Sequence, residues 1–202
     1  MAIRLRLTPD RLRGRAVLRD PAEDARAASP LELLFDLTFV VAVSRASAAL
    51  HHELLAGHIA QGVVGFAAVF FAVWWAWMNF TWFMSAHDAD DVPQRMLTLV
   101  QMTGVLVLAA GVTRAVEDQD FSVAVAGYVI MRLGLVVAWL RVARDVPDCR
   151  QRALRYAAGI TALQILWVLR LAITGELAWT SFVVLGLVEL AIPVWAERAT
   201  PE

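Results

Sequence analysis

Apolar residues along this chain fall into six long runs separated by short polar segments. The runs cover residues 31–50, 62–84, 96–116, 121–140, 154–174 and 177–195. A helix needs about 20 mostly apolar residues to cross the hydrocarbon core of a bilayer, and each run has roughly that length. The pattern therefore predicts an all-α integral membrane protein, a bundle of six transmembrane helices.

Composition agrees with this prediction. The chain is 59% hydrophobic with a mean hydropathy of +0.60, which is more apolar side chain than a soluble core of 202 residues needs. The single Cys149 excludes an internal disulfide. The sequence contains no nucleophile–base pair, zinc motif or cofactor fingerprint. We therefore expect no catalytic residues, cofactor, metal or nucleic-acid partner, and we do not expect an enzyme.

The distribution of arginine predicts the orientation of the helices. Residues 1–28 hold seven of the 18 arginines and have no apolar run typical of a signal peptide, so we expect a polar cytoplasmic tail. With this tail inside, 14 arginines lie on the cytoplasmic side and only Arg114 lies in an outer loop. This bias predicts cytoplasmic termini, a transmembrane domain over residues 29–197 and a C-terminal tail over 198–202.

Several helices carry a polar or charged residue at a similar depth. Counting 1.5 Å per residue from the cytoplasmic helix ends puts these groups roughly 8–12 Å inside. A charge at that depth is costly and is kept for a partner or a function. By depth, Arg132 is the expected partner of Asp36 and Glu189. The predicted ligand or ion pathway consists of Glu32, Asp36, Asn79, Gln101, Arg132 and Glu189.

Two interpretations of this polar layer are open. It is either a relay or binding site for an ion or polar solute, or an interhelical clamp that fixes the order of the helices. Trp74, Trp75 and Trp77 form either an aromatic wall beside this layer or bulky packing against lipid. Arg45 and Arg170 lie far from the cytoplasmic side, where extension to the outer headgroups is the alternative to pairing with an acidic residue.

The loops offer two weaker candidates for cation binding. Adjacent histidines point apart on a helix, which argues against a metal site in the first outer loop. Acidic residues before the third run are typical of a helix N-terminus, although a cation site there is the alternative reading. The residues concerned are His51, His52, Glu53 and His58 in the first loop, and His87, Asp88, Asp90 and Asp91 in the second.

Several stretches resemble the bacterial low temperature requirement A family. Pro30–Val43 is similar to its opening helix, and Trp74–Phe83 with Leu99–Gly104 to its second and third helices. Glu189–Arg198 is similar to its mid-protein connector. The resemblance implies a polytopic protein of the bacterial cytoplasmic membrane. It implies as motif positions Glu32, Phe35, Asp36, Trp74, Trp75, Trp77, Asn79, Asp90, Asp91, Arg95 and Gln101.

Members of that family typically continue into a second block of helices, and this sequence stops before that block. We therefore expect either a truncated half or a short form that pairs with another chain, a copy of itself or a second helical half, in the lipid bilayer. The leading functional hypothesis is movement of a small ion or polar solute through the polar layer. The alternative is a non-transporting membrane component that supports growth in the cold.

Overall fold

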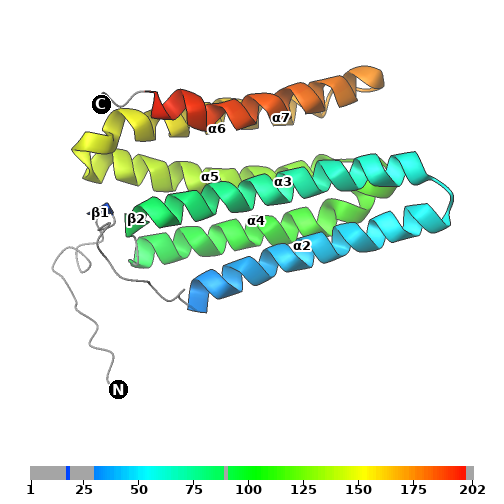
Figure 1. The fold of residues 1–202 in the computed structure, drawn as a ribbon, viewed down its shortest axis with the longest axis horizontal. Coiled ribbons are helices and arrows are strands. Elements are labelled where there is room, and N and C mark those ends of the chain that lie inside the picture. The colour runs from blue at the N-terminus through cyan, green and yellow to red at the C-terminus, as the bar shows by residue number, and fades with distance from the viewer. Residues whose placement is uncertain (1–16, 19–29, 89–90, 199–202) are drawn as a thin grey trace.

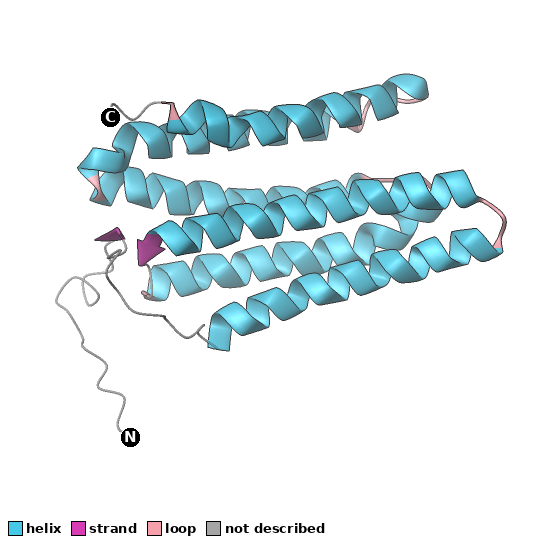
Figure 2. Cartoon of the chain, viewed as in Figure 1, coloured by secondary structure: helices cyan, strands magenta, loops and turns pink. Residues whose placement is uncertain are grey.

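The computed structural model describes residues 17–18, 30–88 and 91–198, and helices make up nearly all of this part (Figure 2). The all-α class is confirmed. The long helices are α2 (Pro30–Leu55), α3 (Ile59–Ala86), α4 (Val92–Glu117), α5 (Ser122–Asp145), α6 (Arg150–Arg170) and α7 (Glu176–Glu197). A short 3₁₀ turn, η1 (Pro147–Cys149), precedes α6, and β1 (Val17–Leu18) pairs antiparallel with β2 (His87–Asp88). The rest of the expected tail over 1–28 lies outside the described residues.

The helices run antiparallel to their chain neighbours, because short loops join them (Figure 1). α5 lies in the middle and packs against α4, α6 and α3, whereas α2 packs against α3 and α4. α7 packs mainly on α6 at the rim of the bundle. The α3–α4 and α5–α6 connections lie at one end of the bundle, where α2 also begins and α7 ends (Figure 1). We call this the proximal end. The opposite end, with the α2–α3 turn, is the distal end.

The tightest helix contact is the one between α4 and α5, where glycines replace side chains. A Cβ placed on Gly127 would lie 2.3 Å from the backbone nitrogen of Leu108, and one on Gly104 would lie 2.6 Å from the side chain of Met131. Small residues at a helix interface let two backbones approach closely, which is how helices in membranes associate. α4 and α5 are therefore the most closely packed helix pair of the bundle.

Five of the helices, α2, α3, α4, α5 and α7, are long and apolar enough to cross a membrane. α6 is not among them, because Arg150, Arg152 and Arg155 lie near its start and Arg170 ends it. The outward faces are strongly apolar, with Leu37 of α2 59% exposed and Leu187 of α7 62% exposed. Soluble monomers rarely expose such continuous apolar surface, so a lipid environment accounts for these faces.

Candidate functional site

Charged and polar side chains from three helices meet where α5, α6 and α7 pack together. Glu189 of α7 is 2% exposed, and its Oε2 accepts a 2.5 Å hydrogen bond from the Tyr128 hydroxyl. The guanidinium of Arg132 lies 3.3 Å from the same oxygen and donates to the Tyr128 oxygen at 2.5 Å. Gln164 of α6 approaches the other carboxylate oxygen at 3.5 Å. We call these four residues the Glu189 network.

The spacing of residues on α5 explains how this network forms. Tyr128 and Arg132 are four residues apart, so they lie on the same face of α5, and the guanidinium covers the tyrosine ring at 4.8 Å. The charges of Arg132 and Glu189 cancel, and the hydroxyl supplies one more hydrogen bond. A buried charge survives only with such partners, because desolvation of an isolated ion costs several kcal/mol or more.

Two cavities lie on the distal side of this network. A narrow apolar cavity of about 30 Å³ has Tyr128, Trp167, Phe182 and Phe121 among its lining residues. A wider one of about 550 Å³ opens between the α4–α5 and α6–α7 loops, and its lining includes Phe121 and Arg170. Because Phe121 belongs to both walls, the two spaces are neighbours. We call the wider cavity the distal vestibule.

Arg170 stands between the two cavities. Its guanidinium donates to the carbonyl of Ala178 at 2.9 and 3.2 Å and lies 5.1–5.8 Å from the ring centres of Phe121, Trp167 and Phe182. Arg170 is only 5% exposed, so the alternative that it extends to the outer headgroups is wrong. The carbonyl and the aromatic faces satisfy its charge inside the protein, which removes the need to reach water. Arg45 is exposed, and its extension to the headgroups stays a prediction.

Asp120 lies at the rim of the distal vestibule. Ser122 lowers the pKa of Asp120 most, through hydrogen bonds from its hydroxyl and its backbone N–H, and the charge of Arg114 lowers this pKa further. The Arg114 guanidinium lies 2.5 Å from the Asp120 carboxylate. An ionised carboxylate therefore remains at the mouth over the physiological pH range.

The structure brings together only two of the residues predicted to form the pathway, Arg132 and Glu189. The expected contact of Arg132 with Asp36 is wrong, because the Asp36 carboxylate accepts a 2.8 Å hydrogen bond from the Trp77 indole instead. Asp36 lies on α2, which packs against α3 and α4, so its exposed side chain faces away from α5 and α7. Depth along a helix says nothing about which face a residue occupies.

The remaining predicted pathway residues are separate from the Glu189 network. The Asn79 amide donates to the carbonyl of Trp75 in its own helix at 2.7 Å. Gln101 is buried against Gly134 at the α4–α5 interface, and its Nε2 has no hydrogen-bond partner in the described part of the chain. Glu32 is half-buried, one turn before Asp36.

The predicted aromatic wall is made of residues with different surroundings. Trp75 is 4% exposed, Trp74 is 40% exposed, and Trp77 is bound to Asp36. None of the three lines either cavity described above. The aromatic residues that do line the apolar cavity, Trp167 and Phe182, were not among the predicted site residues.

Tyr128 is the main residue that the sequence analysis missed. Its hydroxyl is the group nearest to Glu189, yet a tyrosine inside an apolar run gives little signal on its own. The spacing of four residues between Tyr128 and Arg132 was the available clue, because it puts a hydroxyl and a guanidinium on one helix face.

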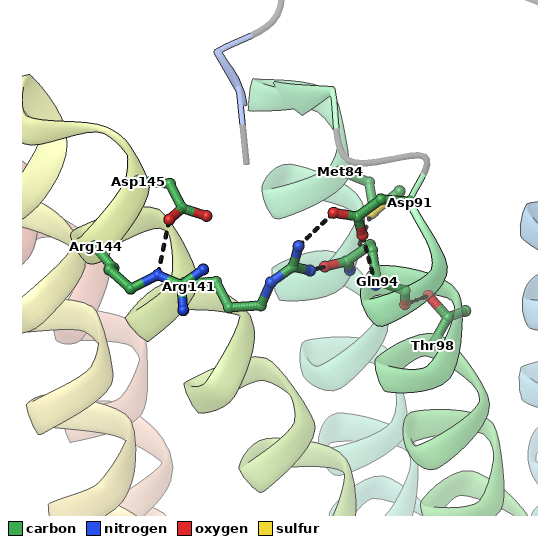
Figure 3. A network of polar contacts seen from close by, with 7 residues as sticks. All are labelled: Met84, Asp91, Gln94, Thr98, Arg141, Arg144 and Asp145. Atoms are coloured by element: carbon green, nitrogen blue, oxygen red, sulfur yellow. Dashed lines mark hydrogen bonds and ion pairs between the residues drawn. The ribbon is translucent and has the colours of Figure 1, made fainter. Parts of the chain in front are cut away.

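A second polar cluster closes the proximal end between α4 and α5 (Figure 3). Asp91 caps α4 by accepting from the backbone N–H of Gln94 at 2.8 Å, and Arg141 of α5 binds its other oxygen. The Arg141 guanidinium also reaches the Gln94 side chain at 3.4 Å. Both carboxylate oxygens of Asp91 are therefore engaged, which favours the capping interpretation over a cation site. Asp90 and the side chain of Asp88 lie outside the described residues.

His87 is fully buried at the end of α3. Its ring stacks on Phe83 and meets Trp139 edge-on, with centroid distances of 4.8 and 5.3 Å. Nδ1 lies 3.0 Å from the Phe83 carbonyl, so Nδ1 carries the proton and Nε2, which has no described partner, does not. Burial lowers the pKa of His87, the Phe83 carbonyl raises it, and the charge of Arg152 lowers it. His87 is therefore a neutral packing residue.

Membrane-length apolar helices with lipid-type outward faces, enclosing a charged network, define a multi-pass helical membrane protein. The family model for the bacterial low temperature requirement A protein matches residues 27–202. The chain therefore belongs to the low temperature requirement A family.

One curated relative comes from Rhizobium meliloti (strain 1021) and is itself an uncharacterized protein. It is 30% identical over 151 residues, which cover 75% of this chain but 36% of the relative. The chain thus spans about a third of the length of this relative. No solved structure matches the chain.

Proposed function

We propose that this membrane domain provides part of a route for a small ion or polar solute, with the Glu189 network as its central gate. The observation that carries the proposal is the contact of Tyr128, Arg132 and Glu189 next to two neighbouring cavities. Ionisable residues inside a membrane bundle mark ion pathways and proton relays.

The order of the groups supports this route. A solute would enter the distal vestibule past Asp120, pass the aromatic residues around Arg170 and reach the apolar cavity. Tyr128 lines this cavity, and its hydroxyl is bonded to Glu189. Glu189 can exchange a proton through that hydroxyl, because the two oxygens are already hydrogen-bonded. Arg132 would stabilise the negative charge of the Glu189 carboxylate while that carboxylate is deprotonated.

We further propose that the domain has six membrane spans, with α6 as the span that composition alone does not identify, and that both termini are cytoplasmic. The antiparallel position of α6 between α5 and α7 supports the sixth span (Figure 1). The arginine distribution supports the orientation, with the distal vestibule on the outer side of the bacterial cytoplasmic membrane.

Dissipation of a pH gradient by proteoliposomes tests the permeation proposal. We expect wild-type vesicles to lose an imposed gradient faster than empty vesicles, and Glu189→Gln to abolish the difference, because an amide cannot cycle a proton. Asp36→Asn is the matched control, since Asp36 lies outside the network, and it should retain the wild-type rate. Wild-type vesicles no leakier than empty ones to protons and common ions would overturn the proposal.

One observation favours a second function, that of a structural membrane component with the network as a clamp. Arg132 and Glu189 are each 2% exposed and neutralise each other, which is the arrangement of a closed interhelical pair. A clamp predicts that Glu189→Gln lowers the thermal stability of the protein in detergent, while no flux is found in wild-type vesicles.

A further inference from the structure

Four side chains that can bind metal ions come together at the distal end, away from the Glu189 network. His52 and Glu53 end α2, His58 precedes α3, and Glu117 ends α4. His52 Nδ1 lies 3.2 Å from a carboxylate oxygen of Glu117 and 3.8 Å from one of Glu53. The three donor atoms of His52, Glu53 and Glu117 all lie within 4.8 Å of one another.

These separations suit one shared ion. Zinc binds imidazole nitrogen and carboxylate oxygen at about 2.0–2.2 Å in a tetrahedral arrangement, so its donors lie about 3.4 Å apart. The distances of 3.2 and 3.8 Å bracket that value. Two carboxylates this close repel each other, and a cation between them turns the repulsion into attraction.

The burial of Glu53 is the second observation that points to a bound cation. Its side chain is 5% exposed, whereas that of His52 is 66% exposed and that of Glu117 29%. A carboxylate withdrawn from water at the end of a bundle needs strong partners.

His58 supports the arrangement from the side. Its Nδ1 lies 3.2 Å from the second carboxylate oxygen of Glu53, while the first oxygen is the one turned to His52. Metal-binding side chains are commonly held in orientation by such an outer hydrogen bond, and loss of the outer partner weakens metal binding by about 10–100-fold.

The backbone around the cluster is fitted closely. A Cβ on Gly62 would lie 2.7 Å from that of Glu53, so only glycine lets α3 pass this near. The Gln61 amide donates to the carbonyls of Val116 and Glu117 at 3.3 and 2.6 Å, which ties the last turn of α4 to α3. These contacts hold the end of α4 close to α2 and α3 without using the side chain of His52 or of Glu117.

We propose that His52, Glu53 and Glu117 bind one divalent transition-metal ion at the distal end, with His58 as the positioning residue for Glu53. The mixed nitrogen and oxygen donor set favours zinc over magnesium and calcium, which prefer oxygen donors alone. Three protein ligands leave one position for water, so the ion faces the solvent side of the bundle and ties α2 to α4. The proposal does not depend on the permeation route.

Calorimetric titration of the tag-free full chain in detergent with Zn²⁺, after removal of bound metal with a chelator, tests the site. We expect one Zn²⁺ per chain, no comparable binding of Mg²⁺, and at least a tenfold loss of affinity in both His52→Gln and Glu117→Gln. His58→Gln should lose about tenfold, as expected of an outer partner.

His51→Gln is the matched control, because His51 is the adjacent histidine and is not part of the cluster. Its affinity should stay within twofold of wild type, and so should that of Cys149→Ser, whose thiol lies at the proximal end. Circular dichroism and gel filtration show whether each variant is folded. If His52→Gln is not folded, Glu117→Gln provides the test of the site. Absence of saturable one-to-one binding, or an equal loss in His51→Gln, would overturn the proposal.

Discussion

Tyr128, Arg132 and Glu189 show how three polar groups can be kept within an apolar bundle. Each accepts or donates at least two contacts within the group, so the charge pair is not left without hydrogen bonds. The sequence could place Arg132 and Glu189 at one depth, because depth follows from counting residues along a helix. The sequence could not predict the contact of Asp36 with Trp77, because tertiary packing decides which face of α2 is turned toward α3.

The same limit applies to the proposed metal site. Adjacent histidines argued against a site in the first outer loop, and in the structure only His52 of the adjacent pair takes part. The decisive ligand, Glu117, comes from another helix more than 60 residues later. No spacing rule within the loop could identify it.

The lowered pKa of His87 predicts that acid reduces the stability of the folded protein. Burial lowers the pKa of His87 in the folded state, so the unfolded chain binds a proton more readily. This stabilisation is complete above the ordinary histidine pKa of about 6.5 and is lost as pH falls through the lower folded-state pKa. We expect the unfolding temperature in detergent to fall between pH 7.5 and 5.5.

His87→Phe is the matched variant, because phenylalanine keeps the ring contacts with Phe83 and Trp139 but cannot be protonated. Its unfolding temperature should depend less on pH than that of the wild type. The distal end of the bundle is unchanged in this variant, so the comparison isolates the contribution of His87. Identical pH profiles would show that His87 does not titrate as described.

At the level of elements, the apolar runs predicted all six helices but not their ends. α5 continues to Asp145 and α6 begins at Arg150, because backbone hydrogen bonding extends past the apolar residues into polar ones. A hydropathy pattern marks the part of a helix that suits lipid, whereas the helix itself stops where a turn such as η1 interrupts it.

The close α4–α5 contact predicts that one methyl group added at this interface lowers the stability of the protein strongly. Gly127→Ala would press a Cβ against the Leu108 backbone, and we expect a loss of about 1–3 kcal/mol in the free energy of unfolding. Gly159→Ala is the control, because its Cβ would meet only the Ile192 side chain, at 3.2 Å. Its stability in detergent should be unchanged or slightly higher, since alanine favours helix. Equal losses in the two variants would contradict the close contact.

At the level of the whole molecule, six antiparallel helices place the α5–α6 connection and the α4–α5 loop at opposite ends. Cys149 is a poor reporter of this arrangement, because it is 6% exposed and its sulfur accepts a hydrogen bond from Arg152. In a Cys149→Ser background, Asp118→Cys should react with a membrane-impermeant thiol reagent in intact spheroplasts. Asp148→Cys should react only after permeabilisation. The reverse pattern would overturn the proposed orientation.

The pairing of Arg132 with Glu189 inside the bundle is tested most directly by a double-mutant cycle in detergent. Arg132→Leu alone leaves the Glu189 charge without its partner, which costs about 3–5 kcal/mol in comparable buried pairs. We predict that adding Glu189→Gln to Arg132→Leu recovers part of that loss, whereas adding Asp36→Asn does not. Strictly additive losses for Arg132→Leu and Glu189→Gln would contradict the pairing.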